Sequence, residues 1–316
     1  MIAFLISAIR LGMSLLLGST GETINEKVGH LNLGIPGIMC VGAACGCYAE
    51  YIYFSSVGRN VIPLLAILIP LLAALIGGAL MGLIFSFLTI TLRANQNMTG
   101  LAITTLGVGM SEYIINEAST IFTKGTKYFT ASLLPIGDTL GDFGKLFFGY
   151  GIFVYLALAI ALITTFVLNR TRVGLHLRAV GENPATADAA GINVSKYRYI
   201  ATCIGCGIAG VGGLAFIMDY LKGNWEYCVD SIGWLAIALV IFTVWRPNLA
   251  IIGSIAFGAL YVASSYIPGV SFAGKALFKM LPYVVTLLVL VITSMRNKRE
   301  NQPPQSLGLS YFREER

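Results

Sequence analysis

The sequence predicts an all-α polytopic membrane protein, and three observations lead to this fold class. Hydrophobic residues make up 56% of the 316-residue chain, charged residues only 11%, and the mean hydropathy is +0.79. A soluble domain has about 25% charged residues, so this chain lacks the polar groups to cover a water-facing surface. Its apolar residues also form long runs, and a run of about 20 matches the hydrocarbon thickness of a bilayer. Such runs must be helical, because no water there satisfies backbone amides.

Hydropathy predicts about eight to ten membrane crossings. Their approximate cores are 2–18, 35–54, 62–91, 98–117, 149–168, 198–218, 232–245, 249–266 and 279–295. The stretch 62–91 is long for one perpendicular helix, and Pro63 and Pro70 are expected to break or tilt it. The segment 232–245 is short and ends before Pro247. It is either a half-helix of the kind that lines a transport path or an ordinary helix that extends beyond these bounds.

Lysine and arginine collect in two segments, and this sets the expected orientation. These basic residues are Arg170, Arg172, Arg178, Lys196 and Arg198 in the segment 169–199, and Arg296, Lys298 and Arg299 near the end of the chain. Positive charge in short loops favours the cytoplasmic side. We therefore expect one membrane domain over 1–296, with a cytoplasmic loop at 169–199 and a flexible cytoplasmic tail at 297–316. The polar segment 19–34 is either cytoplasmic or re-enters the membrane.

Small and charged residues inside the runs indicate how the helices assemble. Ala201, Gly205, Ala209 and Gly213 recur every four residues, and Gly78 and Gly82 form a GxxxG pair. In lipid, such stripes let helix backbones approach closely, so both patterns predict a helix bundle. Arg10 lies midway along the first run, at a cost of about 2.5–3.5 kcal/mol that the surrounding Ile, Leu and Phe residues offset.

The residue types that support catalysis are scarce. The chain has two distant histidines, His30 and His176, and Cys203 and Cys206 lie inside an apolar run with no second ligand pair at zinc spacing. We therefore interpret the cysteines as packing residues and predict neither a metal site nor an enzyme. No Walker phosphate-binding loop is present, so any ATP and Mg²⁺ must be bound by another chain. No basic stripe suggests nucleic acid as a partner.

The most informative polar segment is 173–198. Asn183 is suited to cap a helix N-terminus, and Pro184 suits the first helical position. Alanine-rich residues follow, and Gly191 suits the C-terminal stop. The pattern predicts a short helix with a small surface outside the bilayer, suited to insertion into a partner's groove. A generic connecting loop is the alternative.

This segment resembles the coupling loop of ABC-transporter permeases of the branched-chain amino acid/ribose/nucleoside superfamily. Their pattern, G-x-x-x-R-A-V-G-x-N-P-x-A-A-x-x-x-G-I, is matched from Gly174 to Ile192, except that the alanine pair is broken, with Thr186 before Ala187 and Asp188 after it. The segment 21–37 (GETINEKVGHLNLGIPG) is similar to a second motif of the family, with Lys27 for arginine and Pro36 for glutamate. The segment 93–103 (RANQNMTGLAI) is similar to the family's fourth span. The resemblance covers nearly the whole chain and is closest to nucleoside and simple-sugar permeases.

The resemblance implies a type II importer-like permease that works with several partners. These are a cytoplasmic ABC ATPase subunit that binds the ATP and Mg²⁺, a second related permease in a heterodimer, an extracytoplasmic solute-binding lipoprotein, and the lipid of the bacterial cell membrane. The ATPase-coupling residues it indicates are Arg178, Gly181, Glu182, Asn183, Pro184, Ala187 and Gly191. Asp188 is then expected to tune the choice of partner. Asn32 and Asn97 are candidates for the translocation path, and the segment 19–37 either lines that path or is a structural turn.

The resemblance ranks the solutes as nucleoside first, simple sugar second and branched-chain amino acid third. Two other classes of protein are weighed against this interpretation. A stand-alone secondary carrier needs a coupling-ion site built from buried carboxylates, and the spans contain few candidates, such as Glu50 and Glu112. A membrane-embedded enzyme needs a nucleophile–base set or a metal cluster, which two distant histidines do not provide.

Overall fold

The computed structural model describes residues 2–58, 60–118, 122–133, 141–226, 229–269, 271–296 and 302–312. In these ranges the chain is built from helices, and eight of them are long and apolar enough to cross a membrane. The helices are α1 (Ile2–Lys27), α2 (Ile35–Val57), α3 (Pro63–Ser86), α4 (Gln96–Ala118), α5 (Thr123–Thr130), α6 (Gly141–Phe148), α7 (Ile152–Arg170), α8 (Arg172–Glu182), α9 (Pro184–Ala189), α10 (Val194–Ala215), α11 (Val229–Phe242), α12 (Pro247–Tyr266) and α13 (Phe272–Arg296). The predicted all-α polytopic fold is confirmed.

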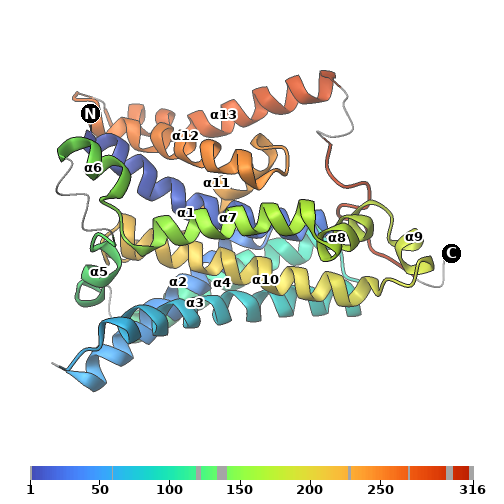
Figure 1. Cartoon of the computed structure of the whole chain (residues 1–316), viewed down its shortest axis with the longest axis horizontal. Coiled ribbons are helices and arrows are strands. Elements are labelled where there is room, and N and C mark those ends of the chain that lie inside the picture. Colours follow the sequence, from blue (N-terminus) through green and yellow to red (C-terminus); the bar gives the residue numbers. More distant parts are fainter. Residues whose placement is uncertain are drawn as a thin grey trace.

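The long helices form a bundle with α1, α2 and α10 at its centre. α10 packs against α1, α2 and α3, while α1 also packs against α11 and α12. Figure 1 shows the short helices α5 and α6 at one end of the bundle and α8, α9 and the end of the chain at the other. The π-helical turns η1 (Phe87–Thr91) and η3 (Phe216–Tyr220) extend α3 and α10. Pro70 lies inside α3 without ending it, so the expected break in this span is absent.

The predicted small-residue stripes are helix contacts. A Cβ added to Gly205 would lie 2.5 Å from the backbone oxygen of Gly21, and one added to Gly78 would lie 2.4 Å from the backbone oxygen of Cys206. Atoms this close would clash, so only glycine permits the observed separation of α10 from α1 and α3. This contact explains how the bundle becomes tight without a hydrophobic driving force from water.

The first helix is longer than the apolar run that predicted it. α1 continues to Lys27, and its residues 11–26 are all buried. The segment 19–27 is therefore neither a cytoplasmic loop nor a separate re-entrant segment, because its polar side chains lie in the protein interior instead of in water. Nearer the start of α1, the Arg10 Nε atom lies 3.8 Å from the Asp219 Oδ1 atom of η3. This ion pair accounts for an arginine in the middle of the run.

The helix α11 has 14 residues. At 1.5 Å per residue it is about 21 Å long, shorter than the hydrocarbon core of about 30 Å, so the short segment predicted at 232–245 is confirmed. The chain leaves α11 through Val244 and Trp245, both with positive φ (54° and 55°). Such angles are costly for bulky residues. The indole Nε1 of Trp245 donates a hydrogen bond to the carboxylate of Glu26 in α1, which holds this turn in place.

The end of the chain differs from the flexible tail that the sequence predicts. Residues 302–312 cross the end of the bundle, where the Ser306 amide donates to the Gly181 carbonyl (3.0 Å) and the Gly308 amide donates to the Gly29 carbonyl (3.2 Å). Backbone hydrogen bonds of this kind join residues that are distant in the sequence, so composition does not reveal them. Residues 297–301 and 313–316, with Lys298 and Arg299, lie outside the described residues.

Candidate functional site

The predicted coupling segment folds as two short helices at one end of the bundle. Thr171 caps α8, and Asn183 caps α9 by accepting a hydrogen bond from the Thr186 amide (3.0 Å). Pro184 occupies the first turn of α9, and Gly191 adopts a positive φ of 82° just after its end. The predicted helix is therefore confirmed, with bounds of Pro184–Ala189. The helix over Arg172–Glu182 was not predicted.

The seven residues predicted to couple to an ATPase divide into an exposed and a buried set. Arg178, Glu182, Asn183 and Gly191 are exposed, and Pro184 is half-buried. Ala187 is buried in an apolar cluster with Val28 and Val180. Gly181 is also buried, and a Cβ there would lie 2.2 Å from the Lys27 backbone oxygen. The buried set therefore anchors the helices to the end of α1, while the exposed set lies on the surface.

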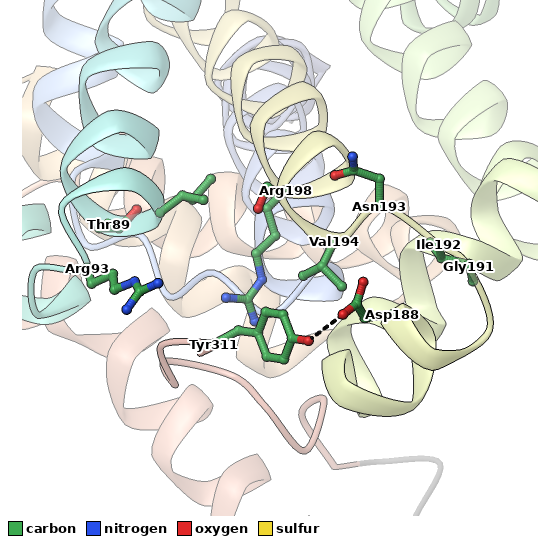
Figure 2. Close-up of a pocket in the computed structure, with 11 residues that line it drawn as sticks. Thr89, Arg93, Asp188, Gly191, Ile192, Asn193, Val194, Arg198 and Tyr311 are labelled. Atoms are coloured by element: carbon green, nitrogen blue, oxygen red, sulfur yellow. Dashed lines mark hydrogen bonds between the residues drawn. The ribbon is translucent and has the colours of Figure 1, made fainter. Parts of the chain in front are cut away.

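The chain's end packs beside this segment around a cavity of about 440 Å³. Its lining includes Arg93, Asp188, Arg198 and Tyr311, drawn in Figure 2. The Tyr311 hydroxyl donates to Asp188 Oδ2 (2.9 Å), and the Arg198 guanidinium donates to the Leu309 carbonyl (3.4 Å). Asp188 thus holds the chain's own tail. The sequence had suggested only a role for Asp188 in partner choice, because its bond to the tail depends on residues 123 positions apart.

A buried polar cluster joins the end of α1 to the start of α2. The Asn25 amide donates to Glu22 Oε2 (2.8 Å), and the Asn32 backbone amide donates to Glu22 Oε1 (3.2 Å). His30 Nδ1 shares a hydrogen bond with Thr202 Oγ1 (2.8 Å). Burial lowers the pKa of His30 well below its usual range, and the nearby charge of Arg198 lowers it further. These hydrogen bonds link the polar side chains of the segment 21–37 to one another and to Thr202 of α10.

The two predicted path residues lie in different environments. Asn32 is fully buried and donates to Cys206 Sγ (3.3 Å), whereas Asn97 is exposed at the start of α4. The structure does not bring them together. Gln96, which sequence reasoning missed, is buried and accepts a hydrogen bond from the Leu31 amide (2.8 Å). Only its place one residue before Asn97, in a segment that resembles a family motif, pointed to this region.

The cysteines lie in helices as the sequence suggested. Cys45, Cys47, Cys203 and Cys206 are free thiols, Cys40 is buried in α2, and Cys206 is buried against the amides of Asn25 and Asn32. Cys228 lies outside the described residues. Among the residues that the structure describes, no three His, Cys, Asp or Glu side chains are grouped so that they would hold a metal ion.

A bundle of membrane-spanning helices with a capped, exposed helix at one end is the architecture that the resemblance to transporter permeases implies. The chain belongs to the family described as the branched-chain amino acid transport system permease component, whose model matches residues 4–290. The match includes the segment 21–37, α4 and the coupling segment, so it covers each motif on which the resemblance rests.

Several permease proteins are similar to this chain over nearly its whole length. The nucleoside ABC transporter permease NupC of Lactococcus lactis is 32% identical and covers 88% of each chain. The guanosine ABC transporter permease NupQ of Bacillus subtilis is 30% identical over 96% of this chain and 94% of its own. The putative glucose ABC transporter permease TsgC13 of Haloferax volcanii is 31% identical over 95% and 94%.

Proposed function

We propose that this chain is the membrane-spanning subunit of an ATP-binding-cassette importer that moves a nucleoside across the cell membrane. The observation that carries the proposal is the position of α9 at the end of the bundle. This capped helix is anchored by the buried side chain of Ala187, and most of its other residues are exposed. Similarity to NupC and NupQ, named for nucleosides and guanosine, supports the solute class. Similarity to the putative glucose permease TsgC13 makes a simple sugar the second candidate.

The partners follow from this role. A separate ATPase subunit binds ATP and Mg²⁺, a lipoprotein delivers the solute to the outer face, and a second, related permease completes the membrane unit. The end of the bundle with α8, α9 and the chain terminus faces the cytoplasm, and the end with α5 and α6 faces outward (Figure 1). The basic residues of the coupling segment support this orientation.

The coupling mechanism uses the two sets of residues in α8 and α9. Arg178 and Glu182 are exposed and contact the ATPase, while Ala187 and Gly181 pass the ATPase movement to the end of α1. The Lys27–Gly29 corner lies against Gly181, so motion of α9 reaches the polar cluster around Glu22 and Asn32. The importer then alternates between an outward-facing and an inward-facing state. Nucleotide binding and the loaded lipoprotein each shift the populations of these two states.

Uptake by the reconstituted complex tests this function. The chain is co-expressed with its neighbouring genes, reconstituted in vesicles, and supplied with labelled nucleosides or sugars, with and without ATP and the lipoprotein. We expect nucleoside uptake that requires both. Uptake by this chain alone, driven by an ion gradient, would overturn the proposal, and ATP-dependent uptake of sugars alone would replace the nucleoside by a sugar.

Variants of the Asn183 cap test the coupling helix. Asn183→Ala removes the hydrogen bond to the Thr186 amide, a loss of about 1 kcal/mol of helix stability. We expect slower uptake and weaker ATPase association, with the bundle intact. Asn183→Asp is the matched control, because aspartate caps helices equally well. Unchanged uptake and association in both Asn183→Ala and Glu182→Gln would exclude this segment as the coupling element.

A further inference from the structure

One face of α4 is unusually polar for an exposed membrane helix. The most apolar stretches of α3 with η1, α4 and α7 are each 33% buried. Their mean hydropathies are 2.6 for Pro63–Thr91, 1.2 for Gln96–Asn116 and 2.3 for Ile152–Arg170. The three stretches are therefore equally buried but differ in mean hydropathy, and α4 is the least hydrophobic of the three.

Three exposed polar residues of α4 share one side of the helix with Gly109, whereas other polar residues of α4, such as Ser111, are buried. Thr105, Gly109, Glu112 and Asn116 are spaced by four, seven and eleven residues, which places them on the same face. All four are exposed, and the adjacent Tyr113 is 70% exposed. Within the described part of the chain, Glu112 forms no ion pair. The face thus presents a carboxylate, an amide, a hydroxyl and an aromatic ring.

Lipid is a poor environment for this face. Ionisable side chains in membrane spans are costly and almost always face a water-filled cavity or a partner. The helix α13 illustrates the lipid-facing alternative, since its most apolar stretch is only 11% buried and has a mean hydropathy of 2.0. The exposed residues of that stretch, Leu287 and Leu288 among them, are mostly aliphatic. Water or polar ligand therefore fits the uncovered face of α4 better than hydrocarbon.

A hollow adjoins this face and shares Thr105 and Gly109 with it, while Glu112 and Asn116 lie outside its lining. It has a volume of about 440 Å³ and is lined by Thr105, Leu106, Gly109, Met110, Tyr113 and Ile114. A Cβ added at Gly109 would meet no atom within 4 Å. Sites for small molecules have volumes of about 300–1,000 Å³, so a solute fits this hollow.

We propose that this face of α4 lines the solute path, with Tyr113 stacking on the base of a nucleoside and Glu112 and Asn116 hydrogen-bonding its ribose hydroxyls. The identity of the solute rests on the proposed function. A ring stacks on any base, and a carboxylate accepts hydrogen bonds from hydroxyls while an amide both donates and accepts. The site would therefore accept several nucleosides with one set of side chains.

Thiol labelling in the assembled transporter tests the path directly. Single cysteines replace Glu112, Tyr113 or Asn116 in a transport-competent background without the native cysteines, and Leu287→Cys and Ile163→Cys serve as exposed controls on α13 and α7. We expect a charged, membrane-impermeant thiol reagent to label the α4 cysteines at least about ten-fold faster than the controls, because thiolates form poorly in apolar surroundings. A saturating nucleoside should slow the labelling of the α4 cysteines alone.

Labelling at the control rate would overturn the proposal. A second result would also overturn it: the α4 cysteines cross-link to the second permease on oxidation but do not react with the charged reagent. They would then lie in a subunit interface without water. These readouts do not depend on wild-type uptake, so they separate a failure of the path from a failure of the proposed function. Fast labelling that a sugar slows and a nucleoside does not would reject the nucleoside while leaving α4 in a water-filled path.

Tyr113 variants test the stacking contact. Tyr113→Ala should lower nucleoside uptake about five-fold or more, the effect expected when a stacking ring is removed, whereas Tyr113→Phe keeps the ring and should retain most uptake. Phe166→Ala on α7, where the ring is 62% exposed, is the matched control for loss of a surface aromatic. Equal uptake in Tyr113→Ala and wild-type protein would exclude the contact.

Discussion

At the residue scale, His30 shows how a polar side chain is used inside this bundle. Its ring is fully buried, shares a hydrogen bond with Thr202 and packs edge-on against Phe85. Burial and the charge of Arg198 both lower its pKa, so the imidazole is neutral in the folded protein. The ring thus links the α1–α2 segment to α10 without adding charge to the interior.

The lowered pKa of His30 predicts a pH dependence of stability. Unfolding restores a pKa of about 6.5, so below that pH the unfolded chain binds a proton that the folded chain does not. Stability should therefore fall as the pH decreases from 7.5 to 5.5, by at most about 1.4 kcal/mol per pH unit from this group. Thermal unfolding of purified His30→Gln should show a smaller fall. An identical pH dependence in both proteins would exclude His30 as its source.

Residue-scale prediction from the sequence succeeded where the signal is local. Asn183, Pro184 and Gly191 define a helix by their own backbone preferences, and α9 has these residues in the expected places. Prediction was less informative for Gln96 and Asn97, since helical periodicity alone does not say which of two adjacent amides is buried. That choice depends on the Leu31 amide, 65 residues away.

At the element scale, the terminal segment 302–312 ties α9 to the end of the bundle where α8 lies. Tyr311→Phe removes the hydroxyl that donates to Asp188, a net loss of about 0.5–1.5 kcal/mol. We expect faster protease cleavage within 302–312, measured on the purified protein. Leu309→Ala is the matched control, because its side chain is 60% exposed and its carbonyl makes the polar contacts. Equal cleavage of Tyr311→Phe and wild type would mean that this bond does not hold the segment.

The α1–α10 contact makes a second prediction at this scale. In Gly21→Ala the new Cβ would lie 2.2 Å from the Gly205 backbone oxygen, so the helices must separate. We expect a loss of about 1–3 kcal/mol, as for other overpacked sites, measured as a lower thermal unfolding temperature. Gly109→Ala adds the same methyl group to open space and should not lower that temperature, because alanine is the better helix former. An unchanged unfolding temperature in Gly21→Ala would show that the α1–α10 contact is not tight.

At the scale of the whole molecule, Arg10 and Asp219 join the first helix to the turn after α10. Their charged groups lie 3.8 Å apart, and their side chains are 18% and 2% exposed. Arg10→Met leaves the Asp219 carboxylate without this partner and should cost about 3–5 kcal/mol, the range for breaking a buried pair. Adding Asp219→Asn should restore much of that loss. A double-mutant cycle by thermal unfolding measures the coupling, and additive losses would mean that the pair does not interact.

The sequence by itself determined the membrane fold, the approximate spans, the short α11 and the capped α9. These properties depend on hydrophobic run length and on backbone preferences of neighbouring residues, which a linear sequence contains. The tertiary structure alone decided that α1 continues through the polar residues 19–27, that residues 302–312 pack on α9, and that the polar side of α4 is left uncovered. Each depends on which distant atoms satisfy a buried polar group or cover a helix face, and this follows only from how the helices pack.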